Sequence, residues 1–204
     1  MDWDEYFINI AYAVALKSKD QSTQVGAVLV GPHREIRSTG YNGPCRGEDD
    51  TNPTIQDRPL KLALFEHAER NCIFNGAFCG VSAADCTLYC TWGPPCTDCA
   101  RAVVQSGIKQ LVYHAEFPGS PNWTESMEIG TGLLVRCGVS MREWSGKPVI
   151  NEIRCAGRLH RFDDTTVDVT LPLPIFAEPI PETSPLPPWR QTLNRWLMAI
   201  PRIG

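Results

Sequence analysis

An alternation of strand, helix and strand in the middle of the chain most constrains its fold. The segments 86–91 (CTLYCT) and 110–115 (QLVYHA) have the composition of short strands, and 95–106 (PCTDCARAVVQS) has that of a helix stopped by Gly107. Two strands joined by a helix usually pair in parallel through a right-handed crossover. The sequence therefore predicts an α/β unit with parallel strands.

The residues before this unit predict a helix and a β-hairpin. The helix should end near Lys19, and its apolar face is marked by residues at intervals of three and four: Trp3, Phe7, Ile10, Ala11 and Val14. The runs 24–30 (QVGAVLV) and 35–42 (EIRSTGYN), joined by a GPHR turn, predict the two antiparallel strands of the hairpin. A polar loop is expected from Gly43 to about Pro59.

The last part of the chain divides into the end of a domain and an extension. A helix around 125–136 and a short strand near 139–142 should complete a domain of residues 1–146. Within the extension, 147–204, seven of the seventeen residues in 172–188 are proline, which predicts an extended strap. It should end in a short amphipathic helix whose apolar stripe is Trp189, Leu193, Trp196, Leu197 and Ile200.

Charge and cysteine usage narrow the class of protein. Nineteen basic and twenty-three acidic residues give a net charge of -4, which argues against nucleic acid as a partner. The nine cysteines are scattered, and we expect them to be mostly reduced. The apolar run 7–16 contains Asn9 and is followed by no cleavage signal, so neither a secretory signal nor a membrane span is predicted. We expect a cytoplasmic protein with no membrane partner.

Two short motifs together predict a metal site. Cys96 and Cys99, in PPCTDC, lie three residues apart at the start of the predicted helix, so their sulfurs can take two corners of a Zn²⁺ tetrahedron. The positive end of the helix favours the thiolates that the metal requires. His67, in the HAE triplet, supplies a third ligand, and three protein ligands leave the open position typical of catalytic zinc.

Glu69 is the candidate catalytic residue of this site. Residues two apart point about 200° away from each other on a helix, so His67 and Glu69 can serve one site only where a helix begins, near His67. A bound Zn²⁺ would lower the pKa of water from about 15.7 to about 7. Glu69 would take a proton from that water, deliver it to the ring nitrogen of a base and later protonate the leaving amine.

Each motif alone has a simpler interpretation. An isolated HxE triplet is usually a solvated helix start, and an isolated CxxC can be a structural zinc site or a redox pair. In this order and with these prolines they match the H-x-E…P-C-x-x-C pattern of zinc nucleobase deaminases. The remaining cysteines are expected to be buried small apolar residues, although a second, structural zinc among them stays an alternative: Cys45, Cys72, Cys79, Cys86, Cys90, Cys137 and Cys155.

Four blocks of sequence, 18–30, 40–50, 66–77 and 93–113, resemble the deoxycytidylate deaminase family in order. The resemblance implies a three-layer α/β/α sandwich around a mixed five-stranded sheet, and hydrolytic deamination of dCMP to dUMP by a zinc-activated hydroxide. It implies His67, Cys96 and Cys99 as zinc ligands and Glu69 as the proton carrier. It further implies a set of substrate contacts: Asn42 to the sugar or base, the backbone of Ala68 to the pyrimidine carbonyl, and Ser22, Thr23, Gln24 and Lys19 to the sugar and phosphate.

The resemblance also implies partners. Related enzymes are often hexamers, so a homo-oligomer is expected. The loop after Tyr41 departs from the family pattern, with Pro44 and Cys45 in place of an apolar residue and proline. Regulation by dCTP and dTTP with Mg²⁺ is therefore an open expectation. A 5-substituted dCMP, or cytosine or adenine in a single-stranded nucleic acid, is an alternative substrate, and an inactive zinc module is the remaining alternative.

Overall fold

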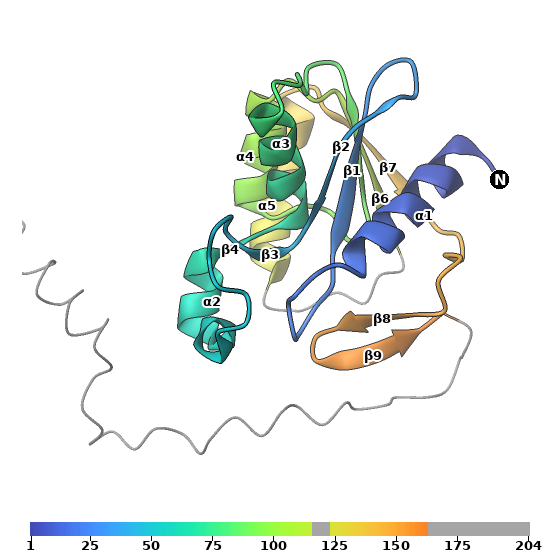
Figure 1. The fold of residues 1–204 in the computed structure, drawn as a ribbon. Helices are drawn as coiled ribbons and strands as arrows, with labels where there is room; N and C mark the ends of the chain where they lie inside the picture. Colours follow the sequence, from blue (N-terminus) through green and yellow to red (C-terminus); the bar gives the residue numbers. More distant parts are fainter. Residues whose placement is uncertain (116–122, 163–204) are drawn as a thin grey trace, which may run out of the picture. The chain divides into compact units, whose positions relative to one another are not determined.

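The computed structural model describes residues 1–115 and 123–162, and a mixed five-stranded sheet of order β2-β1-β5-β6-β7 forms its centre (Figure 1). β1 is antiparallel to β2 and β5, whereas β5, β6 and β7 run parallel. The predicted hairpin and the predicted strand-helix-strand unit are therefore confirmed. The strands are β1 Gly26–Val30, β2 Ile36–Tyr41, β5 Thr87–Cys90, β6 Gln110–His114 and β7 Ser140–Trp144.

Helices cover both faces of this sheet. α1 (Trp3–Ala15) lies on one face, and the other face carries α3 (Ala68–Phe78), α4 (Thr97–Gln105) and α5 (Thr124–Arg136) (Figure 1). Successive strand residues alternate between the two cores, because side chains along a strand point to opposite faces. Val28, Tyr89 and Val112 pack toward α1, whereas Leu29, Leu88 and Leu111 pack toward the three-helix side. The three-layer α/β/α architecture is confirmed.

The first helix differs from its prediction in length and in orientation. It ends at Ala15, before the predicted end near Lys19, and the hydroxyl of Ser18 then donates to the carbonyl of Asn42 at 2.7 Å. Its buried face is centred on Ile8, Ala11, Tyr12 and Ala15, whereas Trp3 is 48 % exposed. The sheet against which the helix packs, and not the spacing of its largest apolar residues, determines which face is buried.

The expected polar loop from Gly43 to Pro59 is wrong in part. A 3-10 helix occupies Pro53–Gln56, where the side chain of Asn52 accepts from the Thr54 amide at 3.0 Å, and α2 begins at Arg58. α2 (Arg58–Leu64) has no buried residue, so the sequence contains no apolar stripe that would predict this helix.

A short ribbon fixes the start of α3. β3 (Gly43–Pro44) pairs with β4 (Phe65–Glu66), and the partners are Gly43 with Glu66 and Pro44 with Phe65. This pairing brings the end of β2 next to the beginning of α3. Asn42 precedes Gly43 and His67 follows Glu66, so the pairing of Gly43 with Glu66 places these two distant residues side by side.

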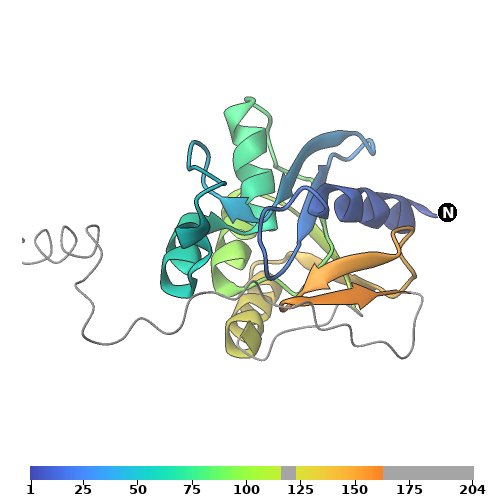
Figure 2. The same ribbon diagram turned by 60° about the horizontal axis from the view of Figure 1, so that its bottom comes forward.

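The region expected as an extension begins with a second hairpin. β8 (Glu152–Cys155) pairs with β9 (Arg158–Arg161) in a hairpin drawn in orange in Figure 2. Ile153 and Cys155 of β8 are buried in the core around α1. The domain boundary at residue 146 stays a prediction. The predicted strap 172–188 and the terminal helix after it lie outside the described residues. Within the described ranges, no helix is long and apolar enough to cross a membrane.

Candidate metal centre

The side chains of His67, Cys96 and Cys99 converge where α3 and α4 begin. Nδ1 of His67 lies 3.4 Å from the sulfur of Cys96 and 3.4 Å from that of Cys99. In a tetrahedron with Zn–S of about 2.3 Å and Zn–N of about 2.0 Å, a sulfur and a nitrogen ligand would be roughly 3.5 Å apart. All three candidate ligand atoms lie within 4.8 Å of one another. The donor set and its spacing fit one tetrahedral metal ion.

Two helix caps position these ligands. His67 is the N-cap of α3, with φ -75° and ψ 155°, and Cys96 is the N-cap of α4, with φ -63° and ψ 168°. Both caps have extended backbone, so each side chain is turned over the tip of its helix instead of along its side. Cys99 lies within the first turn of α4. The predicted helix start near His67 is confirmed.

The three side chains influence one another's protonation. The hydrogen bond from Cys99 and the contact with His67 lower the pKa of Cys96 to about 4, against the effect of burial. The same hydrogen bond to Cys96, together with burial, raises the pKa of Cys99. Burial opposes the charged imidazolium, but the hydrogen bond to Cys96 and the charge of Glu69 outweigh it and raise the pKa of His67 to about 9. The cluster stabilises a thiolate at Cys96 at neutral pH.

Glu69 lies in the first turn of α3, beside this cluster, and is only 6 % exposed. Burial raises the pKa of its carboxyl, and the charge of His67 partly offsets that effect. A carboxyl whose pKa moves toward neutrality can both accept and return a proton. The structure thus places a buried carboxyl with a raised pKa beside the three candidate ligands.

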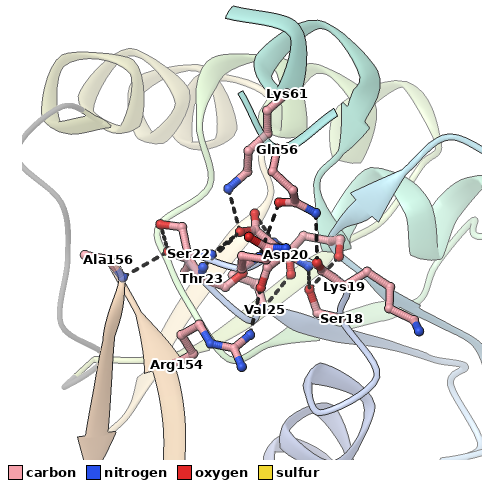
Figure 3. A network of polar contacts seen from close by, with 12 residues as sticks. Ser18, Lys19, Asp20, Ser22, Thr23, Val25, Gln56, Lys61, Arg154 and Ala156 are labelled. Atoms are coloured by element: carbon pink, nitrogen blue, oxygen red, sulfur yellow. Dashed lines mark hydrogen bonds and ion pairs between the residues drawn. The ribbon is translucent and has the colours of Figure 1, made fainter. Parts of the chain in front are cut away.

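The loop of residues 19–24 carries four of the predicted substrate residues, and Asp20 organises it (Figure 3). Oδ1 of this buried carboxylate accepts from the amides of Ser22 at 2.7 Å and Thr23 at 3.0 Å. It also accepts from Nζ of Lys61, on α2, at 2.5 Å. The loop therefore has a fixed shape, with one ion pair that joins it to α2.

Asn42 closes this loop from the side of the sheet. Its amide nitrogen donates to Oδ2 of Asp20 at 3.1 Å and to the carbonyl of Thr23 at 2.7 Å, and its Oδ1 accepts from the amide of Val25 at 2.7 Å. Because the next residue, Gly43, pairs with Glu66, Asn42 also lies beside the start of α3. The start of β1, which follows the loop, lies beside the end of β5, which leads to Cys96, so the loop and the candidate ligands lie at the same end of the sheet.

The predicted substrate residues lie on the loop, directly after β2 and at the start of α3. Ser22, Thr23, Gln24 and Ala68 lie on the loop and at the first position of α3. The amine of Lys19, however, lies on a half-exposed side chain and pairs with Asp50 at 3.7 Å.

Sequence reasoning missed three residues that hold the loop: Asp20, Lys61 and Arg154. The spacing of Asp20 before Ser22 and Thr23 is typical of an Asx turn and could have indicated the first of them. The other two come from distant segments and carry no such signal.

A groove of about 500 Å³ lies at the opposite ends of β1 and β5 and contains none of the predicted site residues. Its lining includes Trp3, Asp4, Arg34, Lys109 and Arg142. Asp4 and Arg142 pair with each other there at 2.6 Å, and Arg34 stacks over Trp3.

Comparisons with known proteins agree with this geometry. Residues 1–115 match the family model described as the cytidine and deoxycytidylate deaminase zinc-binding region. The deoxycytidylate deaminase of Mus musculus is 32 % identical over 152 residues, which are 72 % of this chain and 82 % of the mouse protein. A probable deoxycytidylate deaminase of Drosophila melanogaster is 37 % identical over 140 residues, 63 % of this chain and 68 % of that protein.

A solved structure is similar in fold. It is the crystal structure of the dCMP deaminase from the cyanophage S-TIM5 in complex with dCMP and dUMP, and its TM-score is 0.51 at 25 % sequence identity. The similarity covers 69 % of this chain and 95 % of the phage chain.

Proposed function

The chain belongs to the cytidine and deoxycytidylate deaminase family, and from this premise we propose that it hydrolyses dCMP to dUMP and ammonia. The observation that carries the proposal is the convergence of His67, Cys96 and Cys99 beside the buried carboxyl of Glu69. Several relatives at this level of identity are named deoxycytidylate deaminases, which supports dCMP over other cytosine compounds.

The enzyme is zinc-dependent, and we assign His67, Cys96 and Cys99 as the residues that hold Zn²⁺. Two sulfurs and an imidazole nitrogen are the ligands that zinc prefers, and their separations fit a tetrahedron. When bound there, Zn²⁺ lowers the pKa of water to about 7 and so supplies a nucleophile at neutral pH.

Glu69 moves the protons of the reaction. Its carboxylate takes a proton from the attacking water and delivers it to the ring nitrogen next to the amino-bearing carbon. The water oxygen bonds to that carbon, and Glu69 then takes the second proton from the new hydroxyl group and gives it to the amine. The carbon–nitrogen bond breaks, the carbonyl forms and ammonia leaves. Burial suits Glu69 to this work, because its raised pKa makes the protonated and ionised forms closer in free energy.

The remaining residues position the substrate. The amide of Ala68, at the first position of α3, has no acceptor within its own helix and is assigned to the pyrimidine carbonyl. Ser22, Thr23 and Gln24 are assigned to the sugar and phosphate. Asn42 stands between the loop and α3, where it can touch the sugar or base with the second lone pair of its Oδ1.

A substrate panel tests the function. Wild type should convert dCMP with loss of cytosine absorbance, whereas Glu69→Gln should lose at least about a thousandfold in kcat and keep its zinc. Glu128→Gln, an exposed position on α5, is the matched control and should keep wild-type activity. Turnover of a single-stranded oligonucleotide without turnover of dCMP would overturn the proposal. Methylated and hydroxymethylated dCMP, assayed beside dCMP, test the alternative substrates.

Further assignments extend this proposal. We propose a homo-oligomer, a hexamer by resemblance, in the cytoplasm, with a catalytic domain of residues 1–146 and an extension of 147–204. Sedimentation velocity with and without dCTP and dTTP in the presence of Mg²⁺ tests both the oligomer and the regulators. A monomer under all conditions would contradict the oligomer.

A further inference from the structure

The hairpin β8–β9 is bonded to the loop that carries the assigned sugar and phosphate contacts. The backbone of Arg154 forms a two-way pair with Gln24: the Gln24 amide donates to the Arg154 carbonyl at 2.9 Å, and the Arg154 amide donates to Gln24 Oε1 at 3.2 Å. Nη1 of Arg154 then reaches back and donates to the carbonyl of Asp20 at 2.9 Å (Figure 3). One residue of the hairpin thus holds both ends of the loop segment 20–24.

The turn of the hairpin holds the middle of the same segment. The amide of Ala156 donates to the hydroxyl oxygen of Thr23 at 3.0 Å, and the amide of Gly157 donates to the carbonyl of Ser22 at 2.8 Å. Both turn residues have positive φ, 51° and 78°, as a two-residue type I′ turn requires. Alanine is disfavoured at positive φ, and such backbone persists where surrounding contacts fix it.

The hairpin can act as a rigid support because its own inner face is anchored. Ile153 and Cys155 are 1 % and 4 % exposed and pack in the core around α1. Asp20 and Lys61 hold the loop from the opposite flank, through α2. The family model ends at residue 115, so the hairpin lies outside the matched part of the chain.

We propose that Arg154 is a positioning residue for the substrate, which acts through the loop and not by touching the reacting atoms. With the hairpin turn it holds residues 20–24 in the shape that receives the sugar and phosphate of the nucleotide. This inference rests on the proposed function.

The test compares Arg154→Gln with Arg161→Gln. Arg161 lies on β9, is exposed, and pairs with Glu152 at 3.4 Å, so its replacement removes the same charge from the hairpin without touching the loop. Hydrogen exchange of the amides of residues 22–24 and steady-state kinetics with dCMP are measured on zinc-loaded protein. Zinc content and the thermal midpoint are measured on the same samples.

Arg154→Gln should speed exchange of the loop amides by about tenfold, as expected for one lost hydrogen bond, and should raise KM by a similar factor with kcat within about twofold. Arg161→Gln should change neither. Unchanged exchange, or faster exchange with unchanged KM, would overturn the positioning role, and so would a KM effect accompanied by loss of zinc or a lower thermal midpoint. Failure of wild type to deaminate dCMP would instead overturn the proposed function, while the exchange measurement would still report on the hydrogen bonds between Arg154 and the loop.

Discussion

β2 and α3 lie in close contact at Gly40, and Gly40→Ala tests whether this contact sets the geometry of the metal centre. A Cβ at this position would lie 2.2 Å from the amide nitrogen of Cys72 and 2.6 Å from the carbonyl oxygen of Ala68. Both atoms belong to the backbone of α3, so neither can move without the helix. The same helix carries His67 at its cap and Glu69 in its first turn.

The size of the effect follows from these distances. An ordinary contact needs about 3.4 Å, so α3 must withdraw from the sheet by roughly 1 Å. Overpacking of this kind costs about 1–3 kcal/mol, and two backbone contacts place Gly40→Ala at the upper end. For a chain of this length, ~3 kcal/mol lowers Tm by roughly 6–12 °C. A catalytic geometry tolerates about 0.5 Å, so activity should fall by about a hundredfold.

Thermal melting followed by circular dichroism, zinc content and dCMP turnover measure these effects. Gly76→Ala is the matched control on the same helix, because its Cβ would meet its nearest neighbour, Cβ of Ser38, at 3.5 Å. Since alanine is the better helix former by about 1 kcal/mol, this control should keep or raise Tm. If Gly40→Ala melts within about 2 °C of wild type and keeps full activity, the close approach does not hold α3 in place.

Two further changes test other parts of the structure. Ile153→Ala should cost about 2–5 kcal/mol, because Ile153 is 1 % exposed in the core around α1, and an unchanged urea midpoint would show that the hairpin does not pack there. The hydrogen bond from Arg142 lowers the pKa of Asp4 below its ordinary value of 3.8, so this pair stabilises the fold above that pH and its contribution is lost as pH falls through the lower pKa. Asp4→Asn should therefore lower the free energy of unfolding by on the order of 1 kcal/mol or less at pH 7, because the group is partly exposed, and by still less near pH 3. Equal losses at both pH values in urea titrations would contradict the ion pair as their origin.

The predictions that succeeded depend on local rules. The strand-helix-strand pattern needs only periodicity and a stop signal, and Gly107 supplies that signal with φ 78°. The start of α3 at His67 follows from the requirement that residues two apart serve one site. Neither inference needs knowledge of distant contacts.

The features that the sequence did not predict depend on partners far along the chain. α2 has no buried residue and therefore no apolar stripe, and the buried face of α1 is set by the sheet beneath it. The pairs of Lys61 with Asp20 and of Arg154 with Gln24 join residues separated by 41 and 130 positions. The hairpin at 152–161 carries Ala-Gly at its turn, a weaker signal than Asn-Gly, within a region expected to be an extension.

The double use of His67 and Cys96 as helix caps and as candidate metal ligands has an evolutionary consequence. Neither residue makes a side-chain capping hydrogen bond within the described chain, and aspartate, asparagine or serine would cap these helices better by about 1 kcal/mol. A screen that rewards stability alone would therefore favour substitutions at both positions that destroy the centre. Stability and activity compete at these two residues, so their identity in any variant reports which of the two was under selection.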